Sequence, residues 1–264
     1  MLRPMIAAAM LSPSLVAAEP LDLYAAGSLR AALSEVAAAF TTATGVEVRT
    51  EFAPSGLLRE RIEAGETVSV FASANMAHPQ ALAAQGLGGP VVLFAGNRLC
   101  GLARPGLEVT EASLLEAMLS DEVSLGISTP EADPSGDYAW TLFEKAEALS
   151  PGAEPALKDR AQQLTGGPDS AAAPEGRNLY GWHVAEGRAD LFLTYCTNAH
   201  LAQRENPDLQ IVSVPPALSV GADYGLTVLQ DRPEAAQLAL FILSPEGQSI
   251  LAGYGFEAPT LPSE

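Results

Sequence analysis

Histidine, cysteine and clustered positive charge are all scarce in this sequence. Its 264 residues include three histidines, two cysteines and 14 Lys and Arg against 32 Asp and Glu, for a formal net charge of −18. His78, His183 and His200 are dispersed, and no pair of His or Cys has a spacing typical of metal ligands, so we expect no metal-cation site. Because phosphate neutralisation needs clustered Lys and Arg, nucleic-acid binding is excluded as well.

Long hydrophobic runs are missing after the N-terminus. No later segment is both long and apolar enough to span a bilayer, so we expect no direct membrane insertion. Residues 1–18 carry one early positive charge, Arg3, then a short apolar stretch that ends in Val-Ala-Ala, which is typical of a secretory signal cut after Ala18. Pro13 interrupts this stretch and argues against a membrane anchor. The sequence therefore predicts export to the periplasm.

The two cysteines, Cys100 and Cys196, lie almost a hundred residues apart, each in an apolar, strand-like run. Export permits a disulfide between them. Spacing alone cannot supply the geometry that a disulfide needs, so two buried free thiols remain the alternative.

Strand-like and helix-like segments alternate along the chain, a rhythm typical of βαβ units with parallel strands. The helix expected at 29–44 has apolar residues at three- and four-residue steps. The expected strands are 21–25, 46–52, 68–72, 91–94, 99–103, 123–127, 191–195 and 224–229. The other expected helices are 56–64, 111–119, 138–149 and 233–243, and residues 166–174 are expected to form a loop.

Two such series in one chain predict an α/β protein with two lobes. We expect residues 19–96 to form the first part of lobe 1, residues 97–231 to form lobe 2, and residues 232–264 to return to lobe 1. Because ligands of open α/β sheets bind beyond the carboxyl ends of the strands, the cleft between the lobes is the expected site.

Four turns place a hydroxyl group at the end of a strand, beside a helix start or loop. They are Gly27-Ser28, Pro54-Ser55-Gly56, Pro134-Ser135-Gly136 and the strand end at Tyr195. Serine at one such position is an ordinary helix N-cap. Their occurrence in both expected lobes favours a shared anionic ligand, because helix N-termini offer unpaired N–H groups and partial positive charge.

Five stretches together carry a family resemblance over nearly the whole mature chain. They are LYAAGSLRAALSEVAAAF, GVEVRTEFAPSGLLRERIEAGETVSVFASAN, DPSGDYAWTLFEKA, GRADLFLTYCTNA and FILSPEGQSILAGYGF. This combination resembles the periplasmic molybdate-binding proteins of ABC transporters, which are type II periplasmic solute-binding proteins. The resemblance implies two α/β lobes, each a mixed sheet flanked by helices, joined by crossing segments around a tetrahedral oxyanion.

The resemblance also implies which residues bind the ligand. Ser28 matches a serine that binds the anion through its hydroxyl and amide, and Ser55 matches a second serine. Ser135 stands where a small residue, usually alanine, donates its amide. The phenol of Tyr195 and the amide near Asn178 complete the expected set.

Some residues depart from the family pattern. The serine-rich turn is reduced to Pro54-Ser55-Gly56, and Arg177-Asn178 is more polar than the family pattern. Arg59 and Arg61 are expected to face solvent on a helix. An arginine that faced the cleft would instead favour a carboxylate or phosphonate ligand.

The expected function is capture of molybdate or tungstate, without a cofactor, by a monomer that delivers it to an ABC-transporter permease in the inner membrane. A hydrolase is not expected, because the sequence has no G-x-S-x-G elbow. Such an enzyme also needs a histidine and an acid near the serine, and His78, which follows FASANMA, is expected to be a surface helix cap rather than a cleft residue. Two alternatives remain. One is the same fold binding another oxyanion or a small organic anion such as a phosphonate or carboxylate, and the other is a sensor without transport.

Overall fold

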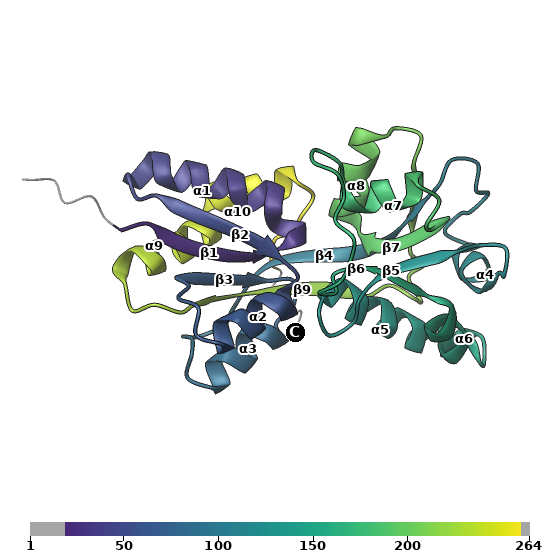
Figure 1. Cartoon of the computed structure of the whole chain (residues 1–264), viewed down its shortest axis with the longest axis horizontal. Coiled ribbons are helices and arrows are strands. Elements are labelled where there is room, and N and C mark those ends of the chain that lie inside the picture. The colour runs from purple at the N-terminus through teal and green to yellow at the C-terminus, as the bar shows by residue number, and fades with distance from the viewer. Residues whose placement is uncertain (1–18, 260–264) are drawn as a thin grey trace, which may run out of the picture.

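The computed structural model describes residues 19–259, in two α/β lobes that lie side by side (Figure 1). The expected signal, residues 1–18, lies outside the described residues. Strands β4 and β9 run between the lobes and connect them. The two-lobed α/β fold predicted from the sequence is thereby confirmed.

The first lobe is a mixed sheet in the order β2-β1-β3-β9-β4, in which β1 pairs in parallel with β2 and β3, and β9 is antiparallel to β3 and β4. Its strands are β1 (Leu21–Ala26), β2 (Val48–Ala53), β3 (Val70–Ser73) and β9 (Gly221–Val228), together with the first half of β4 (Val92–Ala103). Its helices are α1 (Arg30–Thr44), α2 (Ser55–Glu63), α3 (Ala77–Ala84), α9 (Pro233–Leu243) and α10 (Pro245–Gly253).

The second lobe is built on the other half of β4, which pairs antiparallel with β7 and β8, while β5 lies parallel between β7 and β6. Its remaining strands are β5 (Leu125–Ser128), β6 (Gln162–Thr165), β7 (Leu191–Tyr195) and β8 (Gln210–Ser213). Its helices are α4 (Leu114–Leu119), α5 (Pro134–Leu149), α6 (Ala153–Arg160), α7 (Leu179–Ala185) and α8 (Cys196–Glu205).

Strand β4 corrects the sequence prediction of two strands at 91–94 and 99–103. It is one strand, because the intervening residues 95–98 pair with β9 after a bulge between Leu93 and Ala95. Its partners then change, since Leu99 and the following residues pair with β7. β9 joins the first sheet at Gly221, ahead of the return predicted at residue 232. The residue limits of the two lobes stay a prediction.

The helix that follows the first strand forms as its periodicity predicts. Leu33, Val36 and Phe40 of α1 are buried against the sheet, and the helix ends at Gly45, whose φ of 75° suits a residue without a side chain. A short 3₁₀ turn, η1 (Gly27–Leu29), joins β1 to α1. This turn carries Ser28 at the carboxyl end of β1.

Cys100 of β4 and Cys196 at the start of α8 form a disulfide, with their Cα atoms 4.9 Å apart. This finding decides between the two states that the sequence left open. Cys196 is a helix residue rather than the strand residue that its apolar surroundings indicated. The bond ties the first turn of α8, directly after Tyr195, to the strand that crosses between the lobes.

Candidate functional site

A cavity of about 490 Å³ lies between the two lobes. Its wall includes residues at or just beyond the carboxyl ends of β1, β2, β3, β6 and β7, which is where open α/β sheets bind ligands. Of the five predicted ligand residues, Ser28, Ser55, Asn178 and Tyr195 line this cavity. The fifth, Ser135, does not. Hydroxyl groups from both lobes therefore meet in one place, and their roles toward a ligand stay a prediction.

Ser28 is held by a residue of the crossing strand β9. Its Oγ lies 3.0 Å from the hydroxyl of Tyr224. The Asn97 side chain donates to the same phenol oxygen at 3.3 Å, which leaves the tyrosine proton available for Ser28. Burial raises the pKa of Tyr224 and keeps it a neutral donor. Ser28 Oγ can accept that proton and direct its own into the cavity.

Ser55 is the first residue of α2 and is fully buried. Its Oγ accepts the backbone N–H of Ala74 at 3.1 Å, so the hydroxyl proton is still available to a ligand. The next residue, Gly56, donates its N–H to the carbonyl of Ala132 in the other lobe at 2.9 Å. A Cβ at Gly56 would lie only 2.5 Å from the carbonyl oxygen of Glu131. The lobes meet here as closely as a glycine allows.

Tyr195 ends β7 and packs against other tyrosines between the lobes. Its ring centroid is 5.6 Å from that of Tyr224 and 6.3 Å from that of Tyr138. Its hydroxyl makes a long hydrogen bond of 3.5 Å to the carbonyl of Ala74. Burial raises the pKa of Tyr195 well above its ordinary value, so the phenol stays protonated and can donate.

Ser135 is fully buried in the first turn of α5. Its N–H donates to Oδ1 of Asp133, the N-cap residue, at 3.0 Å, and its hydroxyl has no hydrogen-bond partner among the described residues. The cavity wall at this point is formed by Asp133. The amide that the sequence assigned to the ligand is thus taken up by an ordinary helix cap.

Asp133 is a carboxylate in the wall of an expected anion site. Burial raises its pKa to about 6, against the opposing effect of hydrogen bonds from the Ser135 amide and the Ser128 hydroxyl. No ion pair among residues 19–259 includes it. In the sequence this residue is the Asp of DPSG. An Asp before a helix is typical of an N-cap, so the sequence alone did not indicate that it lines the cavity.

Asn178 caps α7, and its side-chain oxygen accepts the N–H of Gly181 at 3.0 Å. Its own N–H donates to the carboxylate of Glu205 at the end of α8. Glu205 also pairs with Arg177, which lines the cavity. The Asn178 amide and the Arg177 side chain, both noted in the sequence, are therefore bound to the Glu205 carboxylate.

Arg30 lines the cavity from α1 and was missed from the sequence. Its guanidinium donates to the carbonyl of Phe52 at 3.1 Å and stacks on that ring, 4.9 Å from the centroid. No ion pair among residues 19–259 includes Arg30. The available signal was its place two residues after Ser28. Tyr180 and Asn198 are further polar lining residues that the sequence patterns did not indicate.

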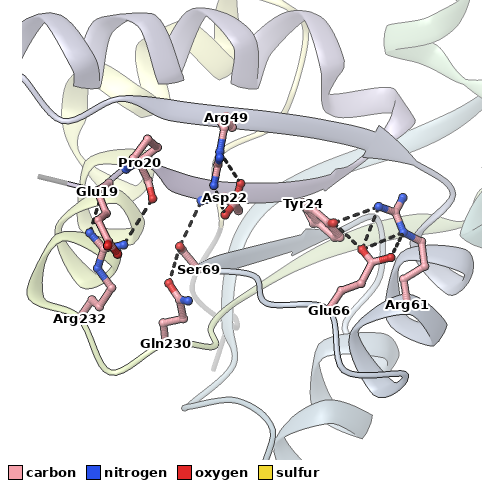
Figure 2. A network of polar contacts seen from close by, with 10 residues as sticks. All are labelled: Glu19, Pro20, Asp22, Tyr24, Arg49, Arg61, Glu66, Ser69, Gln230 and Arg232. Atoms are coloured by element: carbon pink, nitrogen blue, oxygen red, sulfur yellow. Dashed lines mark hydrogen bonds and ion pairs between the residues drawn. The ribbon is translucent and has the colours of Figure 1, made fainter.

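Arg59 and Arg61, by contrast, do not line the cavity. Arg61 pairs with Glu51 and Glu66, and Figure 2 shows it beside Tyr24 and Glu66. Arg59 pairs with Glu63. Neither arginine faces the cleft, and the prediction that both face solvent needs only the correction that these contacts leave them half-buried.

The described residues contain no cluster of three or more His, Cys, Asp or Glu that could hold a metal ion. None of their helices is long and apolar enough to cross a membrane. Among the serines that line the cavity, no hydrogen bond to a histidine is formed within residues 19–259. The site as built offers hydrogen-bond donors, one arginine without an ion pair and one carboxylate.

Residues 21–257 match the family model described as bacterial extracellular solute-binding protein. The chain belongs to this family. It is also 38% identical to the uncharacterized protein PM1146 of Pasteurella multocida (strain Pm70). The alignment of 236 residues covers 89% of this chain and 97% of PM1146. Members of the family bind solutes, and this is the class of activity that the match assigns.

Solved structures of solute-binding proteins share the fold. The periplasmic molybdate-binding protein of Azotobacter vinelandii superposes with a TM-score of 0.68 at 20% identity, covering 91% of this chain and all of that one. The sulfate-binding protein SubI of Mycobacterium tuberculosis H37Rv gives 0.72 at 16% identity, covering 91% and 87%. Because two different anions are named for these two relatives, the shared fold alone does not choose the solute.

Proposed function

We propose that this solute-binding protein captures a small anion in the inter-lobe cavity and delivers it to an ABC-transporter permease in the inner membrane. It would act in the periplasm as a monomer, without a cofactor. The observation that carries the proposal is the convergence of Ser28, Ser55 and Tyr195 on one cavity from both lobes. Neutral donors explain how a protein with net charge −18 can bind an anion.

Molybdate or tungstate is the first candidate, from the sequence resemblance. Such an oxyanion would accept hydrogen bonds from the hydroxyls of Ser28, Ser55 and Tyr195. Hydrogen bonds to a charged group contribute roughly 1.5–3 kcal/mol each, so a handful is enough for micromolar binding after the entropy cost.

A larger organic anion is the second candidate, and the size of the cavity favours it. A tetrahedral oxyanion has only five atoms, which is few for a cavity of about 490 Å³. Cavities of roughly 300–1,000 Å³ are typical of sites for small organic ligands. Arg30, which has no carboxylate partner among the described residues, adds a cation suited to a carboxylate or phosphate.

Calorimetric titration of the mature protein tests the proposal. The ligands are molybdate, tungstate, sulfate, phosphate, a phosphonate and a small carboxylate. We expect at least one of them to bind, and the Tyr195→Phe variant to bind that anion more weakly because it loses a donor. Binding of none of these anions would contradict the proposed function.

A further inference from the structure

Two opposite charges that form no ion pair among the described residues line the same cavity from different lobes. Arg30 stands in the first turn of α1, and Asp133 caps α5 in the second lobe. Neither belongs to an ion pair among residues 19–259. In a chain with 14 basic and 32 acidic residues, a cavity-lining arginine without a carboxylate is available to a ligand.

Arg30 is oriented but not neutralised. One of its five N–H donors is used by the carbonyl of Phe52, and the stacking on that ring fixes the plane of the guanidinium. The other donors stay available for a carboxylate or phosphate, which guanidinium binds with two parallel hydrogen bonds. The anionic end of a ligand can therefore bind the Arg30 guanidinium, on the side of the cavity formed by α1.

Asp133 has the opposite requirement. A carboxylate only accepts hydrogen bonds; that of Asp133 accepts the Ser135 amide at Oδ1 and the Ser128 hydroxyl, and its two oxygens have room for about four such bonds. Gly166, with φ of +83°, packs directly on this side chain, because a Cβ there would lie 2.5 Å from the Cβ of Asp133. A bare oxyanion brings no proton to this wall and is repelled by it. A hydroxyl or ammonium group would satisfy it.

We propose that the solute is an organic anion with two ends, an anionic group bound by Arg30 together with the hydroxyl donors, and a hydroxyl or ammonium group bound by Asp133. This inference rests on the proposed function, because it takes the inter-lobe cavity as the solute site. The cavity has room for such a molecule, since its volume of about 490 Å³ lies in the range of roughly 300–1,000 Å³ typical of sites for small organic ligands. Phe52, Leu179 and Leu201 provide apolar wall for a carbon skeleton.

Two matched pairs of probes separate this solute class from a bare anion. Glycerol 3-phosphate and propyl phosphate share the phosphate and the chain length and differ in two hydroxyls. Lactate and propionate differ in one. In calorimetric titration of the mature protein, we expect the hydroxylated member of at least one pair to bind about tenfold or more tighter than its partner, and tighter than molybdate and inorganic phosphate.

The variant Asp133→Asn gives the decisive reading. Asparagine still caps α5, so the fold is kept. We expect the affinity for the hydroxylated probe to fall about tenfold, while propyl phosphate, phosphate and molybdate bind more tightly because a like charge is removed. Asp137→Asn is the control, because Asp137 lies on the same helix outside the cavity lining. This variant should bind the hydroxylated probe and the other anions as the wild type does. Arg30→Gln should weaken the binding of every anion. Arg49 pairs with Asp22 elsewhere in the first lobe, so Arg49→Gln should leave anion binding unchanged.

Three outcomes overturn the inference. They are tighter binding of molybdate than of either hydroxylated probe, equal binding within both pairs, and a gain of affinity for every anion in Asp133→Asn. Each of these leaves the proposed function standing, because an anion still binds. If no anion of either set binds, the proposed function fails as well.

Discussion

The hydroxyl of Ser28 lies 3.0 Å from that of Tyr224, a residue 196 positions further along the chain. Ser28 follows the first strand of the first lobe, whereas Tyr224 belongs to β9, which runs between the lobes. A predicted ligand serine is thus oriented by a side chain of the connecting strand, and the serine's position depends on how the lobes are joined.

This relationship predicts a graded loss of solute affinity in two variants. Ser28→Ala removes a donor and should weaken binding by about 1–3 kcal/mol. Tyr224→Phe keeps the serine but removes its partner, so the loss should be smaller. Titration calorimetry with the best-binding anion measures both, and Tyr254→Phe, whose hydroxyl contacts Glu35 on the surface, is the control. Unchanged affinity in Ser28→Ala would mean that this serine serves only the fold.

Ser55→Ala should lower the stability of the protein as well as its affinity. The variant leaves the backbone N–H of Ala74 without its acceptor in a buried position. An unpaired buried group costs about 1–3 kcal/mol, which urea unfolding of the ligand-free protein can detect. Ser34→Ala, at an exposed position of α1 in the same cavity lining, should leave the unfolding free energy unchanged. Equal stability of wild type and Ser55→Ala would show that the Ala74 amide finds another acceptor.

Gly56→Ala should hold the lobes apart. Its Cβ would lie 2.5 Å from the carbonyl of Glu131 and 2.8 Å from that of Ala132, both backbone atoms of the other lobe. Overpacking typically costs about 1–3 kcal/mol, so solute affinity should fall about tenfold. Small-angle scattering with saturating solute should show a larger radius of gyration than for the wild type. Gly253→Ala, where a Cβ meets nothing within 4 Å, is the control, and wild-type affinity in Gly56→Ala would contradict this account of the contact.

Loss of the disulfide should weaken both stability and binding. The double variant Cys100→Ala, Cys196→Ala should lose about 2–5 kcal/mol of unfolding free energy. Because Cys196 directly follows Tyr195, we expect solute affinity to fall too, as the start of α8 loosens. Thermal melts with and without reductant check this, and reductant should shift the wild type but not the double variant. An identical melting temperature for the wild type in both conditions would refute the prediction.

Local patterns predicted the parts of the fold and site that depend on neighbours in sequence. The period of α1 and the turn at Ser28 are examples, because a helix face and a strand-to-helix turn are encoded within a few residues. Four of the ligand residues that the family resemblance predicted line the cavity. A family resemblance carries tertiary information that a single local pattern lacks.

The parts that could not be predicted depend on long-range contacts. Gly96 and Asn97 read locally as an interruption, and only pairing with β9 makes them part of one strand. Asp133 has the residue type and place typical of a helix N-cap, and it also lines the cavity, a role that depends on how the second lobe faces the first. Arg30 contacts the carbonyl and ring of Phe52, a residue 22 positions away, and no local pattern reveals such a contact.

The path of β9 also fixes an order of assembly. Between β3 and β4 the first sheet is completed by a strand that begins at Gly221, so β3 keeps an open edge until nearly the whole chain has been made. Pairing across such sequence separations is slow, because loop-closure entropy is lost before the contact forms. The sheet of the first lobe is therefore complete only after the strands of the second lobe have been made, since β9 follows β8 in the sequence.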